Sequence, residues 1–243
     1  MHALTLKENH NVKKVAIVQS NYLPWKGYFD LIGLVDEFIL YDSVQYTRRD
    51  WRNRNLIKTP QGLQWLTIPV VVGGKYHQRI DETRISDPEW NVKHWKALAH
   101  AYRRSPYFEA YRARLECLFL DCRETYLSKI NHRFLVTICD ILGIATPLAC
   151  STQYPSQGDD KTERLVGLCR AAGASVYLSG PAARNYLSPE LFAAAGIELR
   201  YMDYSGYPEY PQFHGTFEHG VTILDLLFQC GPTAPHYMKF PRG

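Results

Sequence analysis

The stretch VAIVQSNYLPWKGYFD, residues 15–30, decides the class of fold. Its first four residues are apolar without interruption, which is typical of a strand that is buried on both faces of a sheet. Pro24 is a favourable first residue of a helix, and Phe29 and Ile32 continue at helical spacing. A second apolar run at residues 38–41 predicts another strand. The chain therefore opens as strand, loop, helix and strand, the unit from which parallel sheets are built.

The last third of the chain repeats this alternation, whereas the middle is mostly helical in pattern. We therefore expect an α/β fold with a mostly parallel or mixed sheet, helices on both of its faces, and a helical middle segment. The chain is also expected to form a β-hairpin or meander over 57–72 and strands at 175–178 and 197–202. The other expected helices start at Asp87-Pro88 or cover residues 127–141, 161–172, 188–196 and 222–230.

Composition excludes several classes of protein. The 243 residues are 46% hydrophobic, and 28 Lys and Arg against 24 Asp and Glu give a net charge of +4, as in an ordinary folded domain. No apolar run approaches the ~18 residues that a membrane span needs. The six cysteines are scattered without a Cys-x-x-Cys pair, which favours reduced thiols in a cytoplasmic protein. We expect a flexible leader at 1–12, one domain over 13–232 and a C-terminal tail at 233–243.

The excess positive charge lies in one segment. Residues 46–58 hold five Lys and Arg side chains and one Asp, so five minus one equals the whole net charge of +4. Arginine suits bidentate recognition of phosphate or carboxylate. A nucleotide-sugar diphosphate, a lipid-linked diphosphate or an RNA backbone would fit, and we expect a pocket wall for a phosphorylated small molecule, with tRNA as the second interpretation. The candidate binding residues here are Arg52, Asn53, Arg54 and Asn55.

The loop after the first strand is a candidate binding loop. Amides at a helix N-terminus attract an anion, and Gln19 and Asn21 add side-chain amides. Tyr22 and Trp25 offer flat faces to a sugar or a base. The alternative is that these two rings form a hydrophobic plug beside the strand.

A second candidate follows the next strand. Asp42 should project into the same crevice as Gln19, because the carboxyl ends of parallel strands meet at one edge of the sheet. A carboxylate there can act as a general base or hold an amino group. Gln45 and Tyr46 accompany it as candidate binding residues, and the alternative for Asp42 is a turn cap.

The last third adds two groups of candidates. Tyrosines recur at every third position from 201 to 210, in a segment where glycine and proline forbid a helix. Tyr-rich loops bind sugars through stacking and hydroxyl contacts, although such a loop can also be a lid packed by its own rings. His214 is the best general-base candidate by residue type. The remaining candidates are Tyr210 and Gln212 in this loop, and Ser179, Gly180 and Tyr186 after the preceding strand.

Together these stretches resemble the WbqC-like protein family. The matching pieces span residues 14–231 and include residues 15–30, 41–46 and 50–55. Ser20 stands where that family usually has a proline, and Ser43 stands where a second acidic residue is common. The resemblance implies a bacterial protein of surface-polysaccharide or O-antigen biosynthesis, and a glycine transferase role has been suggested for such proteins.

From these residues we expect an acyl- or aminoacyl-(glycyl-)transferase that acts on an amino group of a sugar or small metabolite, in surface-polysaccharide or secondary-metabolite biosynthesis. Asp42 or His214 would be the base, and amides near Asn21 or at Ser179-Gly180 would stabilise the oxyanion. The pattern requires no cofactor beyond an activated donor, and it predicts no metal site. The alternatives are a nucleotidyl- or adenylate-forming enzyme, or a non-catalytic binding protein of a polysaccharide assembly complex.

Overall fold

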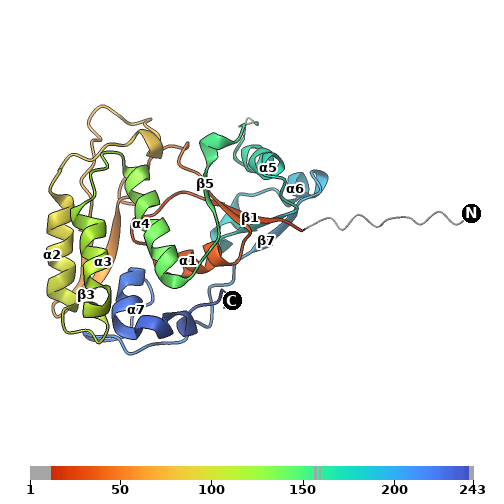
Figure 1. The fold of residues 1–243 in the computed structure, drawn as a ribbon. Helices are drawn as coiled ribbons and strands as arrows, with labels where there is room; N and C mark the ends of the chain where they lie inside the picture. Colours follow the sequence, from red (N-terminus) through yellow and green to blue (C-terminus); the bar gives the residue numbers. More distant parts are fainter. Residues whose placement is uncertain (1–11, 156–157, 159, 241–243) are drawn as a thin grey trace, which may run out of the picture.

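The computed structural model describes residues 12–155, 158 and 160–240. The predicted leader, except Val12, and the last three residues of the predicted tail lie outside this range. Five parallel strands form the central sheet (Figure 1). In spatial order they are β5 (Leu148–Cys150), β2 (Glu37–Leu40), β1 (Lys14–Val18), β6 (Val176–Ser179) and β7 (Glu198–Tyr201). The predicted α/β class with a parallel sheet is therefore confirmed.

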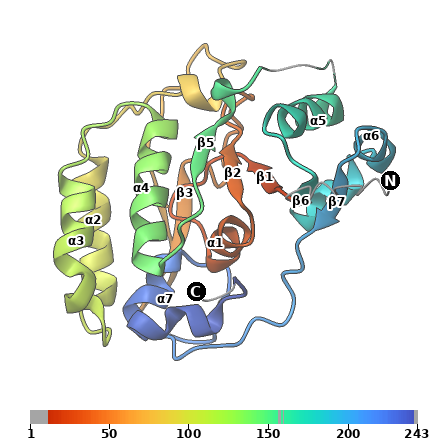
Figure 2. The same cartoon turned by 45° about the vertical axis from the view of Figure 1, so that its right-hand side comes forward.

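Helices cover both faces of this sheet (Figure 2). Alternate strand residues point to opposite faces: Ala16 and Phe38 belong to one hydrophobic core, and Val15 and Ile39 belong to the other. The first core is covered by α1 (Lys26–Gly33), α4 (Leu127–Leu142) and α7 (Ile223–Cys230), and the second by α5 (Lys161–Ala171) and α6 (Pro189–Ala194).

The middle segment is inserted between β2 and β5. It contains the antiparallel hairpin of β3 (Arg54–Thr59) and β4 (Gly62–Thr67), the 3-10 helix η1 (Ile80–Glu82), α2 (Trp90–Tyr102) and α3 (Phe108–Leu120). The hairpin is confirmed, although β3 begins three residues earlier than predicted. The helix expected to start at Asp87-Pro88 begins two residues later: α2 starts at Trp90, after the N-cap Glu89.

The strand order fixes where the loops gather. The chain runs from β1 outward to β2 and β5, and then crosses back to β6 and β7 on the other side. The reversal lies between β1 and β6, which is the position where ligands bind in doubly wound sheets. Loops that follow β1, β2, β5 and β6 all leave from the same carboxyl edge. The fold therefore places Gln19, Asp42, Ser151 and Gly180 near one edge of the sheet.

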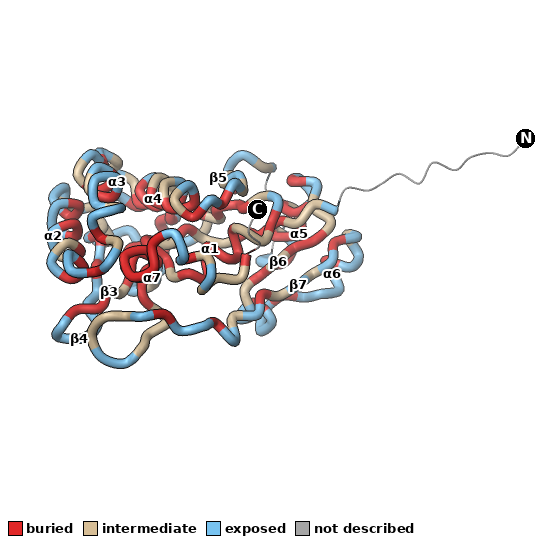
Figure 3. Tube along the Cα trace, turned by 60° about the horizontal axis from the view of Figure 1, so that its bottom comes forward, coloured by how far each residue is buried: buried red, intermediate tan, exposed pale blue. Residues whose placement is uncertain are grey.

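The end of the chain packs against the first core, at the end of the molecule away from the carboxyl edge of the sheet (Figure 1). Figure 3 shows α7 buried along its length, and every residue of this helix is buried. The 3-10 helix η4 (Gly231–Tyr237) follows directly, so the stretch predicted as a tail begins inside an ordered helix. The backbone amides of Lys239 and Phe240 donate to the Asp30 carboxylate at 2.7 and 2.9 Å. Within the described part of the chain, no helix combines the length and apolarity that a bilayer crossing requires.

Candidate functional site

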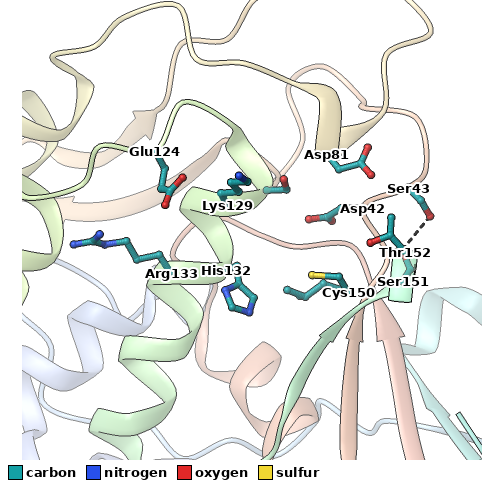
Figure 4. Close-up of a pocket in the computed structure, with 12 residues that line it drawn as sticks. Asp42, Ser43, Asp81, Glu124, Lys129, His132, Arg133, Cys150, Ser151 and Thr152 are labelled. Atoms are coloured by element: carbon teal, nitrogen blue, oxygen red, sulfur yellow. Dashed lines mark hydrogen bonds between the residues drawn. The ribbon is translucent and has the colours of Figure 1, made fainter. Parts of the chain in front are cut away.

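A cavity of about 490 Å³ opens at the carboxyl ends of β2 and β5, between the sheet and α4 (Figure 4). Asp42, two residues after the end of β2, lies in its wall. Asp81 from η1 and Cys150 from the end of β5 line the same side. The opposite wall is formed by α4 and by Glu124 just before it. The cavity thus joins one predicted residue, Asp42, to a set of polar side chains from distant parts of the chain.

Asp42 is held tightly but keeps access to the cavity. The residue is 6% exposed, and its Oδ1 accepts a hydrogen bond of 2.8 Å from the backbone amide of Ser20. Burial raises the pKa of Asp42, while the hydrogen bonds from Ser20 and the charge of Arg52 act in the opposite direction. The raised pKa makes this carboxylate a stronger base than an ordinary aspartate. Its own carbonyl accepts the Asp81 amide at 3.0 Å, which positions η1 at the rim.

Three cationic or ionisable side chains of α4 line the same cavity as Asp42. Lys129, His132 and Arg133 are spaced by three and four residues, so they share one face of the helix, whereas Ile130 and Phe134 are buried in the core. In the part of the chain that the structure describes, no salt bridge joins these three side chains to a carboxylate. They are therefore available to bind a phosphate or carboxylate of a ligand.

The thiol and hydroxyls of the cavity are poor nucleophiles as they stand. Burial, together with the nearby charges of Asp42 and Asp81, raises the pKa of Cys150, which keeps it a thiol at neutral pH. The hydroxyl oxygens of Ser43 and Ser151 bond to each other at 3.0 Å. These side chains therefore do not supply an activated nucleophile in the cavity. Among the described residues, no group of three or more His, Cys, Asp or Glu side chains is arranged to hold a metal ion.

The structure brings Gln19, Asn21 and Arg52 together in the loop whose Ser20 amide contacts Asp42, but none of these three side chains lines the Asp42 cavity. The guanidinium of Arg52 donates to the side-chain oxygen of Asn21, and also to the carbonyl of Gln19 at 3.4 Å. The buried Asn131 of α4 donates to the Ser20 hydroxyl and to the Arg52 carbonyl, both at 2.9 Å. Because these groups are occupied by one another, they brace the loop that holds Asp42.

Tyr22 is part of the core, which corrects the expectation that it binds a ligand. Its side chain is fully buried against Trp90 and Phe134, and its hydroxyl lies 2.9 Å from Nδ1 of His94. Trp25 is half-buried and packs edge-on against two tyrosines of the 202–210 loop. Tyr22 is therefore part of a hydrophobic plug beside the first strand, whereas Trp25 packs against the 202–210 loop.

Four other candidates have structural partners. Asn53 donates to the Ile68 carbonyl and Asn55 to the Leu23 carbonyl, both at 2.8 Å, and both residues are buried. Tyr46 is 7% exposed and belongs to the first core. Ser179 is buried, with its hydroxyl on Tyr177 at 3.3 Å. None of these four side chains lines the Asp42 cavity, because each is committed to packing or to a backbone partner.

The remaining candidates do not converge on Asp42. Tyr210 and Gln212 both donate to the buried carboxylate of Asp225, at 2.8 Å each. His214 lines a separate cavity with His100, Arg103 and Arg104, so it cannot share a reaction with Asp42. The other four lie elsewhere: Gln45 donates to the Tyr76 carbonyl, and Arg54 stacks on Trp65. Gly180 and Tyr186 flank the 3-10 helix η3 (Pro181–Asn185), where Tyr186 is 57% exposed.

The functional candidates missed from the sequence come from segments without a local motif. Asp81, Glu124 and Cys150 lie on three different elements that meet only in the fold. One signal was readable: Lys129, His132 and Arg133 form a polar stripe opposite the apolar face of their helix. A stripe of this kind is usually a solvated surface. Only the position of β5 in the fold shows that this stripe forms a cavity wall.

His94 gives a pH-dependent stability that can be measured. Burial lowers its pKa to about 4, with the hydrogen bond to Thr67 acting in the opposite direction. The unfolded value is about 6.5, so the unfolded chain binds the extra proton first as the pH falls. We expect this residue to reduce the free energy of unfolding by about 2 kcal/mol between about pH 6.5 and about pH 5. Urea denaturation of wild type and His94→Gln at both pH values measures the difference.

The comparison between the two chains isolates His94, since all other titrating groups are shared. The wild type should lose more stability than His94→Gln on acidification. Equal losses in the two proteins would show that His94 is not held neutral in the fold.

Comparisons with known proteins cover nearly the whole chain. A family model described as "WbqC-like protein family" matches residues 19–237. A protein of Mycobacterium tuberculosis (strain ATCC 25618 / H37Rv) named "Uncharacterized protein Rv1507c" is 52% identical over 231 residues, which are 95% of this chain and 100% of the relative. No solved structure matches the chain.

Proposed function

The chain belongs to the WbqC-like protein family, and from this premise we propose that it is an acyl- or aminoacyl-transferase. The reaction would form an amide on the amino group of a sugar or small metabolite. One observation carries the proposal: the buried Asp42 carboxylate, with its raised pKa, lines a cavity whose opposite wall holds Lys129, His132 and Arg133. This arrangement suits a substrate that has an amine at one end and an anionic group at the other.

The acidic side of the cavity would hold the amine. An amine is an ammonium ion at neutral pH, and the carboxylates of Asp42 and Asp81 offer it two negative charges. Nucleophilic attack requires the neutral amine, so the ammonium must give up a proton. Asp42 is the better acceptor of that proton, because burial raises its pKa.

The transfer step balances without a covalent enzyme intermediate. The amine nitrogen forms a bond to the donor's carbonyl carbon, and the bond from that carbon to the leaving group breaks. Two protons leave the nitrogen in all: the first passes from the ammonium ion to Asp42 and then to solvent, and the second passes from the nitrogen of the tetrahedral intermediate to the leaving group. Lys129 or His132 would donate a hydrogen bond to the oxyanion as it develops, while Arg133 holds the anionic part of the substrate.

A product assay tests this function directly. Purified protein is incubated with isotope-labelled glycine in activated forms (glycyl-tRNA, a glycyl thioester, and glycine with ATP) and with amino-sugar nucleotides as acceptors. Mass spectrometry should detect an amide whose mass equals acceptor plus glycine minus water. The same mixtures with acetyl donors cover simple acyl transfer, and the absence of an amide with every donor would refute the proposal.

A second candidate, a nucleotide-handling enzyme, is favoured by the strand order. The reversal between β1 and β6 is where doubly wound sheets bind nucleotides, and Gly180 at this point has open space around its Cα. A melting temperature that rises with ATP concentration would support this function. If ATP leaves the melting temperature unchanged and the amide forms from a preactivated donor, the nucleotide-handling function is excluded and the transferase function is retained.

A further inference from the structure

The positive segment at residues 46–58 does not act as a unit in the fold. Lys58 is 4% exposed, and its ammonium donates to Gln212 at 2.9 Å, so it points into the protein. Arg52 is likewise turned inward against Asn21. Arg48 and Arg49 are exposed to solvent. The segment therefore divides into an inner part that braces the fold and an outer part that faces solvent.

The outer part is unusually aromatic. Trp51 and Trp65 are each 41% exposed, and their ring centroids lie 5.4 Å apart. The guanidinium of Arg54 stacks on Trp65 at 4.1 Å. Trp65 lies on β4, in which only one residue is buried, at the rim of the molecule (Figure 3). Two tryptophans thus present ring surface to solvent beside arginine side chains.

A neighbouring loop extends this surface. Arg48 donates to the Val72 carbonyl at 3.0 Å, and Gln45 donates to the Tyr76 carbonyl at 2.8 Å, which ties residues 72–76 to the arginine segment. Tyr76 is 76% exposed and Lys75 is exposed. We call this surface the aromatic face; it consists of Arg48, Arg49, Trp51, Arg54, Trp65, Lys75 and Tyr76.

The charges around the aromatic face indicate which class of ligand it binds. Asp50 is the acidic residue beside it, and its carboxylate already accepts from Thr47 at 2.8 Å and pairs with Arg52 at 3.4 Å. Among the described residues, no salt bridge joins Arg48, Arg49 or Lys75 to a carboxylate. The face therefore offers flat rings beside cations that lack a carboxylate partner there, which is the combination that binds stacked bases and phosphates in single strands. A second copy of the chain is disfavoured, because a two-fold contact would set arginines against arginines.

We propose that the aromatic face binds a single-stranded polynucleotide. Bases stack on Trp51, Trp65 and Tyr76, while Arg48, Arg49 and Lys75 contact the phosphates. This inference goes beyond the transfer reaction and does not depend on it.

Fluorescence anisotropy tests the proposal on the full chain. The probes are fluorescein-labelled oligo(rU) and oligo(dT) of about 12 nucleotides and a duplex of equal length, at low and moderate salt. We expect both single strands to bind more tightly than the duplex, whose base faces are hidden. Three phosphate contacts predict a log–log salt slope of about −2. Preference for RNA over DNA would identify RNA as the source of the strand.

Matched variants locate the binding surface. We expect Trp51→Ala and Trp65→Ala each to weaken binding by about tenfold, as for loss of one stacking platform. Arg49→Gln/Lys75→Gln should weaken binding and flatten the salt slope without touching the rings. Arg112→Gln, which removes an exposed arginine of α3 outside the aromatic face, should leave affinity unchanged.

Two outcomes would overturn this inference. One is the absence of binding at low salt up to about 100 μM protein, the weak end of non-specific affinity. The other is a dimer in sedimentation that Trp51→Ala/Trp65→Ala dissociates, which would assign the face to a second copy. Amide formation from a glycyl thioester without any strand binding would retain the transferase and reject only the aromatic face.

Discussion

Asp42→Asn is expected to lower the rate of amide formation by about 10²–10⁴-fold, the usual contribution of a general base. Asparagine has the same shape, so its side-chain oxygen can still accept the Ser20 amide that now donates to Asp42 at 2.8 Å. It cannot accept the proton of an ammonium ion. The loss should therefore appear in kcat/KM for the amine acceptor, measured by mass spectrometry of the product.

The pH profile distinguishes a lost base from a damaged fold. Burial raises the pKa of Asp42 above its ordinary 3.8, and the base acts only when ionised, so wild-type activity falls as the pH drops through that raised pKa. Asp42→Asn should lack this acid limb.

Stability gives the second control for Asp42. A raised pKa means that ionised Asp42 costs stability above it, so Asp42→Asn should melt no lower than wild type at neutral pH. Asp140→Asn, on the exposed surface of α4, is the matched control and should keep full activity. If Asp42→Asn retains wild-type rates, Asp42 is not the base.

Most of the fold could be predicted from the sequence because its signals are local. The four apolar residues 15–18 and the helical spacing within 127–141 depend only on neighbours in the chain. Gly143 ends α4 with φ of 72°, a conformation that glycine adopts without strain. The order of the strands was not predictable in this way, since residues far apart in the sequence pair across the sheet.

Only the side of the candidate site at the strand ends was predictable from the sequence. The rule that strand carboxyl ends meet at one edge led to the loop after β1, whose Ser20 amide contacts Asp42, although Gln19 and Asn21 do not line the cavity. The α4 wall was not predictable, because nothing local shows that Lys129 and His132 face a cavity rather than solvent.

Buried polar networks misled the sequence interpretation most. Tyr210, Gln212 and Lys58 have the residue types of a binding site, yet they surround a carboxylate inside the protein. That carboxylate, Asp225, stands in the apolar helix sequence ILDLLFQC and carried no signal of its own. Residue type alone cannot distinguish a side chain that binds a ligand from one that satisfies a buried charge.

Asp225→Ala is expected to destabilise the protein by about 3–5 kcal/mol, the cost of removing one partner from a buried charged network. Asp225 is fully buried, and it accepts hydrogen bonds from the hydroxyls of Tyr102 and Tyr210 at 2.9 and 2.8 Å and from Gln212 at 2.8 Å. Alanine would leave these donors without an acceptor and would remove the negative charge nearest to Lys58. Urea denaturation monitored by tryptophan fluorescence measures the change.

The comparison with Asp225→Asn separates the charge from the hydrogen bonds. Asparagine keeps one acceptor oxygen but introduces an amide donor that faces a donor, so we expect an intermediate loss of about 1–3 kcal/mol. Asp140→Ala on the surface should change stability by less than about 0.5 kcal/mol. A decrease in the free energy of unfolding of less than about 1 kcal/mol for Asp225→Ala would contradict this role of Asp225, because burying unpaired donors costs more than that. Asp225 joins α2, α7 and the 202–221 loop through these contacts. Its loss should therefore loosen that end of the core while leaving the Asp42 cavity at the sheet edge intact.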